Sequence, residues 1–158
     1  MKYFLSLLLN TVFTLLLFSS ISSAAISPNQ LSLGGIYLGD SIDRVYSIYG
    51  KPRTITNNGS TTEYYYGNGL LITFWNESQP KDVVEIKVTE RNGFATPAGI
   101  EVGMHEDILY QVYGKPDVRF ARNVVHYQKY VNNENQSQYI IFAVSEEKII
   151  EILLHWSA

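Results

Sequence analysis

The sequence predicts an α+β protein made of two tandem units, each a helix followed by a three-stranded antiparallel meander, with both helices packed on one face of the sheet. Three observations lead to this prediction. One motif occurs twice, its apolar residues have helical spacing, and apolar and polar residues alternate after each copy. We expect residues 1–25 to be a signal peptide, residues 26–90 to form the first unit and residues 91–158 the second.

The amino-terminal segment has the order of a secretory signal peptide. Lys2 precedes an apolar run that ends at Phe18, and small residues follow as far as Ala25. The run is interrupted by polar residues and is shorter than the roughly 20 residues that a membrane-spanning helix needs. We therefore predict cleavage after Ala24 or Ala25, and a protein that is exported to the periplasm or beyond the cell without a stable membrane anchor. An uncleaved anchor is the alternative.

The repeated motif covers residues 35–52 and 99–116. Nine of the 18 aligned positions are identical, including the Gly-Lys-Pro that closes both copies. Ser41 is a good helix N-cap because its hydroxyl can accept a free backbone N–H. Gly50 and Gly114 precede Lys-Pro, so we expect each to end a helix with a positive φ, in the left-handed conformation.

Strands are predicted after each motif, where the apolar period changes to two. In the first unit they cover residues 62–66, 70–75 and 83–88, and in the second residues 124–131, 139–144 and 149–154. Gly- and Asn-rich turns separate them, as is typical of hairpins. An isolated three-stranded sheet with one helix is only marginally stable, so we expect the two units to pack into one body.

The motif resembles the small exported domains of the SmpA/OmlA (BamE-like) group, in which a Gly-flanked helix precedes tyrosine-rich strands. As a tandem pair, the units resemble the architecture of the β-lactamase inhibitor protein. The resemblance implies a non-enzymatic protein that binds proteins or assists assembly at the cell envelope. The positions that carry it are structural ones: Gly39, Ser41, Gly50, Pro52, Gly103, Gly114 and Pro116.

Composition narrows the possible functions further. The chain has no Cys, which excludes a disulfide scaffold, a thiol nucleophile, a thiolate zinc site and a lipid-anchored cysteine. Its net charge of -3 is ordinary for a soluble protein and lacks the positive charge that is typical of proteins that bind nucleic acid. No serine lies in a nucleophile elbow. We expect neither an enzyme nor a bound metal or cofactor.

The histidines offer only a weak alternative. His126 and His155 are both predicted on the face opposite the core, where they could share a metal only if their strands were adjacent. Two surface histidines are the simpler interpretation.

The aromatic residues point to a binding surface. When Phe74 and Phe142 face the helices, the alternate residues of their strands form an apolar and aromatic patch on the other face. The predicted partner-binding residues are Leu71, Trp75, Tyr139 and Ile141. The alternative is that residues 26–34 or the other unit cover this face. We expect a protein partner in the cell envelope; a secreted enzyme inhibitor, or a small-ligand binder or sensor acting between the units, are the other hypotheses.

Overall fold

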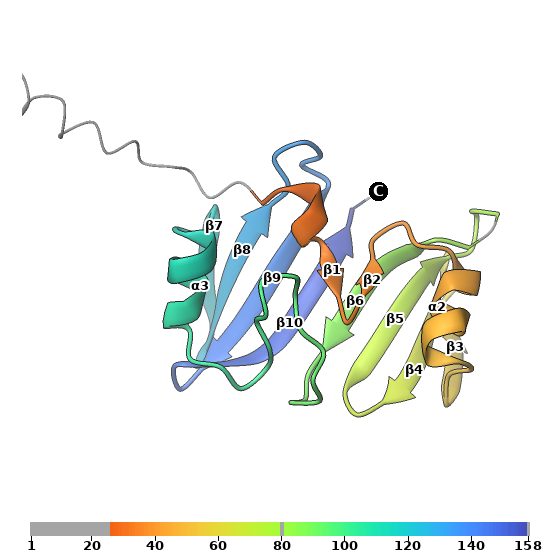
Figure 1. Cartoon of the computed structure of the whole chain (residues 1–158), viewed down its shortest axis with the longest axis horizontal. Coiled ribbons are helices and arrows are strands. Elements are labelled where there is room, and N and C mark those ends of the chain that lie inside the picture. The colour runs from red at the N-terminus through yellow and green to blue at the C-terminus, as the bar shows by residue number, and fades with distance from the viewer. Residues whose placement is uncertain (1–25, 80, 158) are drawn as a thin grey trace, which may run out of the picture.

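The computed structural model describes residues 26–79 and 81–157 and is dominated by one antiparallel sheet of eight strands (Figure 1). Their order across the sheet is β3-β4-β5-β6-β10-β9-β8-β7. The strands are β3 (Thr54–Asn57), β4 (Thr61–Gly67), β5 (Leu70–Trp75), β6 (Val83–Val88), β7 (Val118–Arg122), β8 (Val125–Val131), β9 (Gln138–Ser145) and β10 (Lys148–Trp156). The two halves of the chain therefore meet where β6 pairs with β10, and we call this pairing the seam.

The predicted fold class is wrong. The described residues are mostly β, with 47% strand and 14% helix, and they are not built as two helix-plus-three-strand units. Each helix is followed by four strands, and all eight belong to one sheet. The missed strands, β3 and β7, are the two edges, and every residue in them is exposed. A strand with no buried side carries no alternating apolar pattern for a sequence to reveal.

The described part of the chain contains two α-helices, α2 (Ile42–Tyr49) and α3 (Asp107–Tyr113). The Ser41 hydroxyl accepts the backbone N–H of Arg44 at 3.4 Å, which confirms the predicted N-cap. Gly50 and Gly114 follow the two helices with φ of 70° and 71°, so the predicted positive φ is confirmed. Their ψ values of -152° and -150° are not left-handed helical but lie in a region open essentially to Gly alone.

Each helix end is held by a tyrosine of a neighbouring strand. The Tyr66 hydroxyl donates to the Gly50 carbonyl at 3.3 Å, and the Tyr130 hydroxyl lies 3.2 Å from the Gly114 carbonyl. Tyr66 and Tyr130 stand 64 residues apart, as the two motif copies do. The two segments thus have the same local structure, while the division of the chain at residues 25 and 90 stays a prediction.

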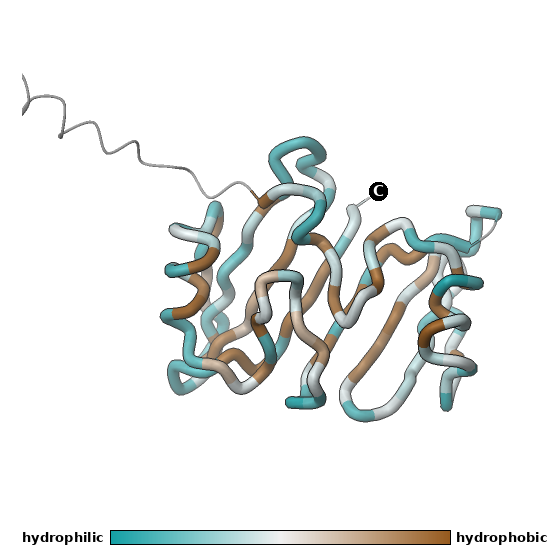
Figure 2. Tube along the Cα trace, in the orientation of Figure 1, coloured by the Kyte–Doolittle hydropathy of each residue, from teal (hydrophilic) through white to brown (hydrophobic). Residues whose placement is uncertain are grey.

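One face of the sheet, which we call the inner face, carries the core. The helices lie on it at either side, and between them lie a two-stranded hairpin, β1 (Ser32–Leu33) with β2 (Ile36–Tyr37), and the segment that links β6 to α3 (Figure 1). A short 3-10 helix, η1 (Pro28–Gln30), precedes the hairpin. The hairpin and linker are tied together by the Gly34 N–H, which donates to the Ala95 carbonyl at 3.0 Å. Figure 2 shows β5 coloured hydrophobic along most of its length, whereas the loops at the rim are hydrophilic.

The segment 26–34 does not cover the opposite face. Leu31 and Leu33 are buried in the same cluster as Phe74 and Phe142 of the inner face. The second half of the chain also leaves that face free, because it extends the sheet sideways through the seam.

The signal-peptide prediction concerns residues 1–25, which lie outside the described residues. Within residues 26–79 and 81–157, no helix is long and apolar enough to cross a membrane.

Candidate functional site

The face of the sheet opposite the two helices, here called the outer face, gathers side chains from all eight strands. Strand register arranges most of them in two rows that cross the sheet. The first row runs Thr54, Tyr65, Leu71, Lys87, Leu153, Ile141, Lys129 and Val118. The second row runs Thr56, Glu63, Thr73, Glu85, His155, Tyr139 and Val131. The outer face thus mixes apolar, aromatic and charged groups.

The four predicted binding residues share the outer face but do not form one contiguous patch. Leu71 and Trp75 lie on β5, and Tyr139 and Ile141 lie on β9, with β6 and β10 between these strands. Lys87 and Leu153 therefore separate Leu71 from Ile141. Leu71 is only 6% exposed and offers a partner little surface, whereas the other three are half-buried.

The centre of the outer face holds a polar and aromatic cluster that the sequence did not reveal. His155 Nδ1 lies 2.9 Å from Glu85 Oε2 across the seam. The Tyr139 ring packs beside the His155 ring with their centroids 5.3 Å apart, and Lys129 Nζ lies 3.5 Å from the Tyr139 centroid. We call Glu85, His155, Tyr139 and Lys129 the central cluster. They come from four strands, so only the order of strands in the sheet brings them together.

A further carboxyl group lies close to the central cluster. Burial raises the pKa of Glu151 on β10, the nearby Lys87 ammonium lowers it, and the Glu85 carboxylate raises it. The net shift is upward, which means that the ionised carboxylate is disfavoured at this place. A hydrogen-bond donor or a cation brought by a partner would therefore be favourable here.

Apolar groups dominate the outer face toward β7. Phe120 and Tyr127 stack face to face, with centroids 4.8 Å apart and ring planes 6° from parallel. Val118 and Phe120 are exposed to nearly half of their area. Exposed rings of this kind are typical anchors of protein interfaces.

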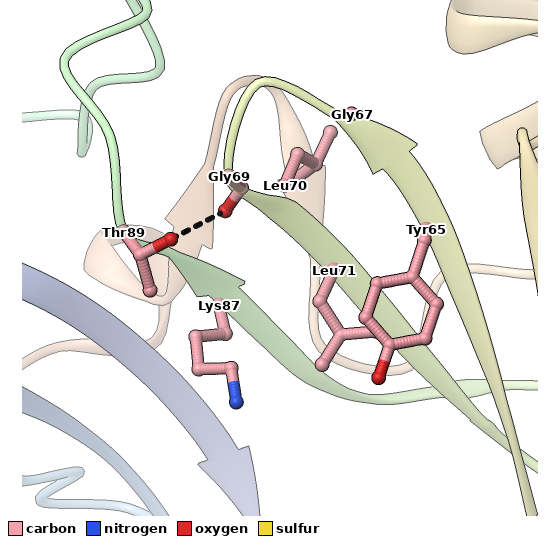
Figure 3. Close-up of a pocket in the computed structure, with 7 residues that line it drawn as sticks. All are labelled: Tyr65, Gly67, Gly69, Leu70, Leu71, Lys87 and Thr89. Atoms are coloured by element: carbon pink, nitrogen blue, oxygen red, sulfur yellow. Dashed lines mark hydrogen bonds between the residues drawn. The ribbon is translucent and has the colours of Figure 1, made fainter.

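A small hollow lies on the outer face at the half away from β7, where the β4–β5 turn approaches β6 (Figure 3). Its volume is about 210 Å³, and Tyr65, Leu71 and Lys87 form its walls together with the turn. The Tyr65 hydroxyl donates to Glu63 at 2.9 Å, and Thr89 donates to the Gly69 carbonyl at 3.5 Å. Ligand pockets usually have roughly 300–1,000 Å³, so the hollow suits a single side chain better than a whole ligand.

The histidines do not share a face. His126 alternates with the buried Gln128 and Tyr130 and so belongs to the inner face, whereas His155 lies on the outer face. The predicted common placement is wrong because Gln128, although polar, is buried; its amide donates to Glu106 at 2.7 Å. Among the described residues, no three His, Cys, Asp or Glu side chains are grouped so as to hold a metal ion.

Comparison with known proteins supplies a fold but no family. No protein-family model and no curated protein matches the chain. Its structure is similar to a DUF4309 family protein (YjgB) from Bacillus subtilis, with a TM-score of 0.51 and 12% identity over 78% of this chain and 83% of that one.

Two further solved structures are similar. One is an extracellular protein containing a SCP domain from Bacillus anthracis, with a TM-score of 0.51 and 11% identity over 75% of this chain and 43% of that one. The other is a cysteine-rich secretory protein (SAV1118) from Staphylococcus aureus, with a TM-score of 0.56 and 12% identity over 85% of this chain and 48% of that one. The chain thus spans less than half the length of these two proteins. None of the three structures is described as a SmpA/OmlA protein or a β-lactamase inhibitor.

Proposed function

We propose that this chain is an exported, non-enzymatic module that binds a protein partner in the cell envelope through the outer face of its sheet. One observation carries the proposal. All the side chains that pack with α2, α3 and the β1–β2 hairpin point to the inner face, so within residues 26–79 and 81–157 the outer face has no covering layer. It nevertheless carries the aromatic, apolar and cationic groups that interfaces use.

The size of the outer face favours a protein over a small ligand. Eight strands about 4.8 Å apart span roughly 38 Å, and five residues at about 3.3 Å each give a height of roughly 17 Å. The resulting area of about 650 Å² approaches the roughly 800 Å² that each partner buries in a standard protein interface. The hollow beside the β4–β5 turn, at about 210 Å³, is small for a ligand on its own.

The exported location rests on two supports. Residues 1–25 have the order of a signal peptide, and two of the structural relatives are described as extracellular or secretory proteins. The resemblance to the SmpA/OmlA group would place the partner at the cell envelope. Amino-terminal sequencing of protein from the native host tests export: a start at Ala25 or Ile26 supports it, and a start at Met1 in the membrane fraction contradicts it.

The binding proposal is tested with a matched pair of tyrosine variants. Tyr139 belongs to the central cluster and is half-buried, whereas Tyr110 lies on α3 at the other side of the molecule and is 39% exposed. Partners captured from envelope extracts are identified, purified and titrated against the wild-type protein, Tyr139→Ala and Tyr110→Ala.

We expect Tyr139→Ala to weaken binding by about 2 kcal/mol, or roughly 30-fold, and Tyr110→Ala to leave it unchanged. Circular dichroism confirms that both variants are folded. Equal affinities for Tyr139→Ala and the wild type, or a selective loss in Tyr110→Ala, would place the partner elsewhere.

A further inference from the structure

The edge strand β7 leaves one of its sides without a hydrogen-bonding neighbour among the described residues. It pairs with β8 in unbroken register from Val118 to Arg122, and no described strand lies beyond it. All five of its residues are exposed. The backbone N–H and C=O groups on its free side therefore form a template that another strand can complete.

Proteins usually prevent stray strand pairing at such an edge by means of charged side chains, a proline or a β-bulge. Residues 118–122 contain no proline and no β-bulge, and their charged side chains are Arg119 and Arg122. The strand also presents Val118 and Phe120, each 46% exposed, and Phe120 is held flat against Tyr127 by ring stacking. A regular, exposed edge of this kind can accept an added strand, and its two arginines act against an added strand of the same charge.

The charge of the edge selects the kind of strand that would join it. β7 carries Arg119 and Arg122 and no acidic residue. Arg119 Nη2 lies 3.9 Å from Glu106 Oε2, a long contact, and that oxygen already accepts the Gln128 amide. Arg122 forms no ion pair within the part of the chain that the structure describes.

A second copy of the chain would be a poor occupant. In an antiparallel pair of β7 strands centred on Phe120, the two Arg119 side chains become diagonal neighbours on one face, and like charges in neighbouring positions are unfavourable. The opposite edge, β3, offers no carboxylate, because its sequence is Thr-Ile-Thr-Asn. Arg119 and Arg122 lie three positions apart on β7, so their side chains point to opposite faces of the sheet. An extended segment with one acidic residue opposite Arg119 and a second opposite Arg122 satisfies both the backbone groups and the two arginines.

We propose that the β7 edge binds an extended acidic peptide segment of a partner protein by β-strand addition. This inference goes beyond the outer-face function, because it concerns the sheet edge and holds whether or not the outer face binds a partner.

The test uses two synthetic peptides of equal length with a Val and Thr background, one with two Glu residues three positions apart and the other with Lys at the same two positions. Hydrogen exchange of individual backbone amides is followed by NMR in the full mature protein. We expect the Glu peptide to slow exchange of the β7 amides about tenfold or more and to leave β3 unaffected. We expect the Lys peptide to have no effect.

Charge-reversal variants make the test specific. Arg119→Glu combined with Arg122→Glu should abolish protection by the Glu peptide and create protection by the Lys peptide. Arg53→Glu, a matched change beside β3, should alter neither. Both variants replace only exposed side chains, and their amide spectra show whether the proteins are folded.

Several results would overturn the proposal. The first two are a failure of the Glu peptide to protect β7 and equal protection by both peptides. The third is protection of β7 that rises with protein concentration in the absence of peptide, which would identify a second copy of the chain as the occupant. Loss of Glu-peptide binding in Tyr139→Ala would show that the peptide binds the outer face, and it would refute only the edge site. The outer-face function is tested separately, by the affinity of the captured partner for Tyr139→Ala.

Discussion

Replacing Gly50 by Ala tests how the motif ends its helix. Gly50 adopts φ 70° and ψ -152°, and a Cβ built at this position meets no atom within 4 Å. The substitution therefore adds backbone strain without a clash. Strain in this region costs about 1–3 kcal/mol, and the lower entropy of the unfolded Ala chain offsets about 0.4–1 kcal/mol. We expect Gly50→Ala to lower the free energy of unfolding by about 1–2 kcal/mol.

Urea denaturation of the purified mature protein measures this loss. Lys51→Ala is the control, since the neighbouring side chain is exposed and its removal should change stability by no more than about 0.5 kcal/mol. A Gly50→Ala midpoint equal to that of the wild type would refute the reasoning, as would an equal loss in Lys51→Ala.

Three further predictions concern the two faces of the sheet and the helix cap. Phe74→Ala should lower the free energy of unfolding by about 3–5 kcal/mol because the Phe74 ring is fully buried, and Trp75→Ala should lower it by about 1–2 kcal/mol because Trp75 is only half-buried. Equal urea midpoints for the two variants would show that the outer face is covered. Burial raises the pKa of Glu151, so the ionised carboxylate destabilises the folded protein near pH 7 and Glu151→Gln should raise the melting temperature there. This gain should vanish below about pH 4, where the carboxyl is protonated in the folded and the unfolded protein alike. A gain that persists in acid would contradict this prediction. Tyr130→Phe should lower the free energy of unfolding, measured in urea, by about 1–2 kcal/mol because it removes the hydroxyl beside the Gly114 carbonyl. An unchanged urea midpoint would show that this hydroxyl does not stabilise the helix end.

The sequence predicts well those elements whose burial is one-sided or complete. β5 and β6 have the predicted bounds, residues 70–75 and 83–88. In β5 every residue but the last is buried, and in β6 the apolar residues near its end alternate with the half-buried Glu85 and Lys87. β3 and β7 escape prediction because hydrogen bonding on one side holds them in place while their side chains stay in solvent.

The candidate site is predictable only in part, because alternation assigns a residue to a face but not to a neighbour. It places Tyr139 on the outer face, yet it cannot show that Tyr139 lies beside His155, or that His155 meets Glu85 across the seam. That knowledge requires the pairing of β6 with β10, two strands more than 60 residues apart in sequence. Alternation also fails where a polar residue such as Gln128 is buried and hydrogen-bonded.

Hydroxyl-radical footprinting, with and without the captured partner, tests the outer-face claim most directly. In the isolated protein, Tyr127 and Tyr139 should be oxidised readily, whereas Phe142, which has no exposed surface, should be protected. Adding the partner should protect Tyr127 and Tyr139 and leave Tyr110 on α3 unchanged. Protection of Tyr127 and Tyr139 in the isolated protein, or protection of Tyr110 by the partner, would contradict the account.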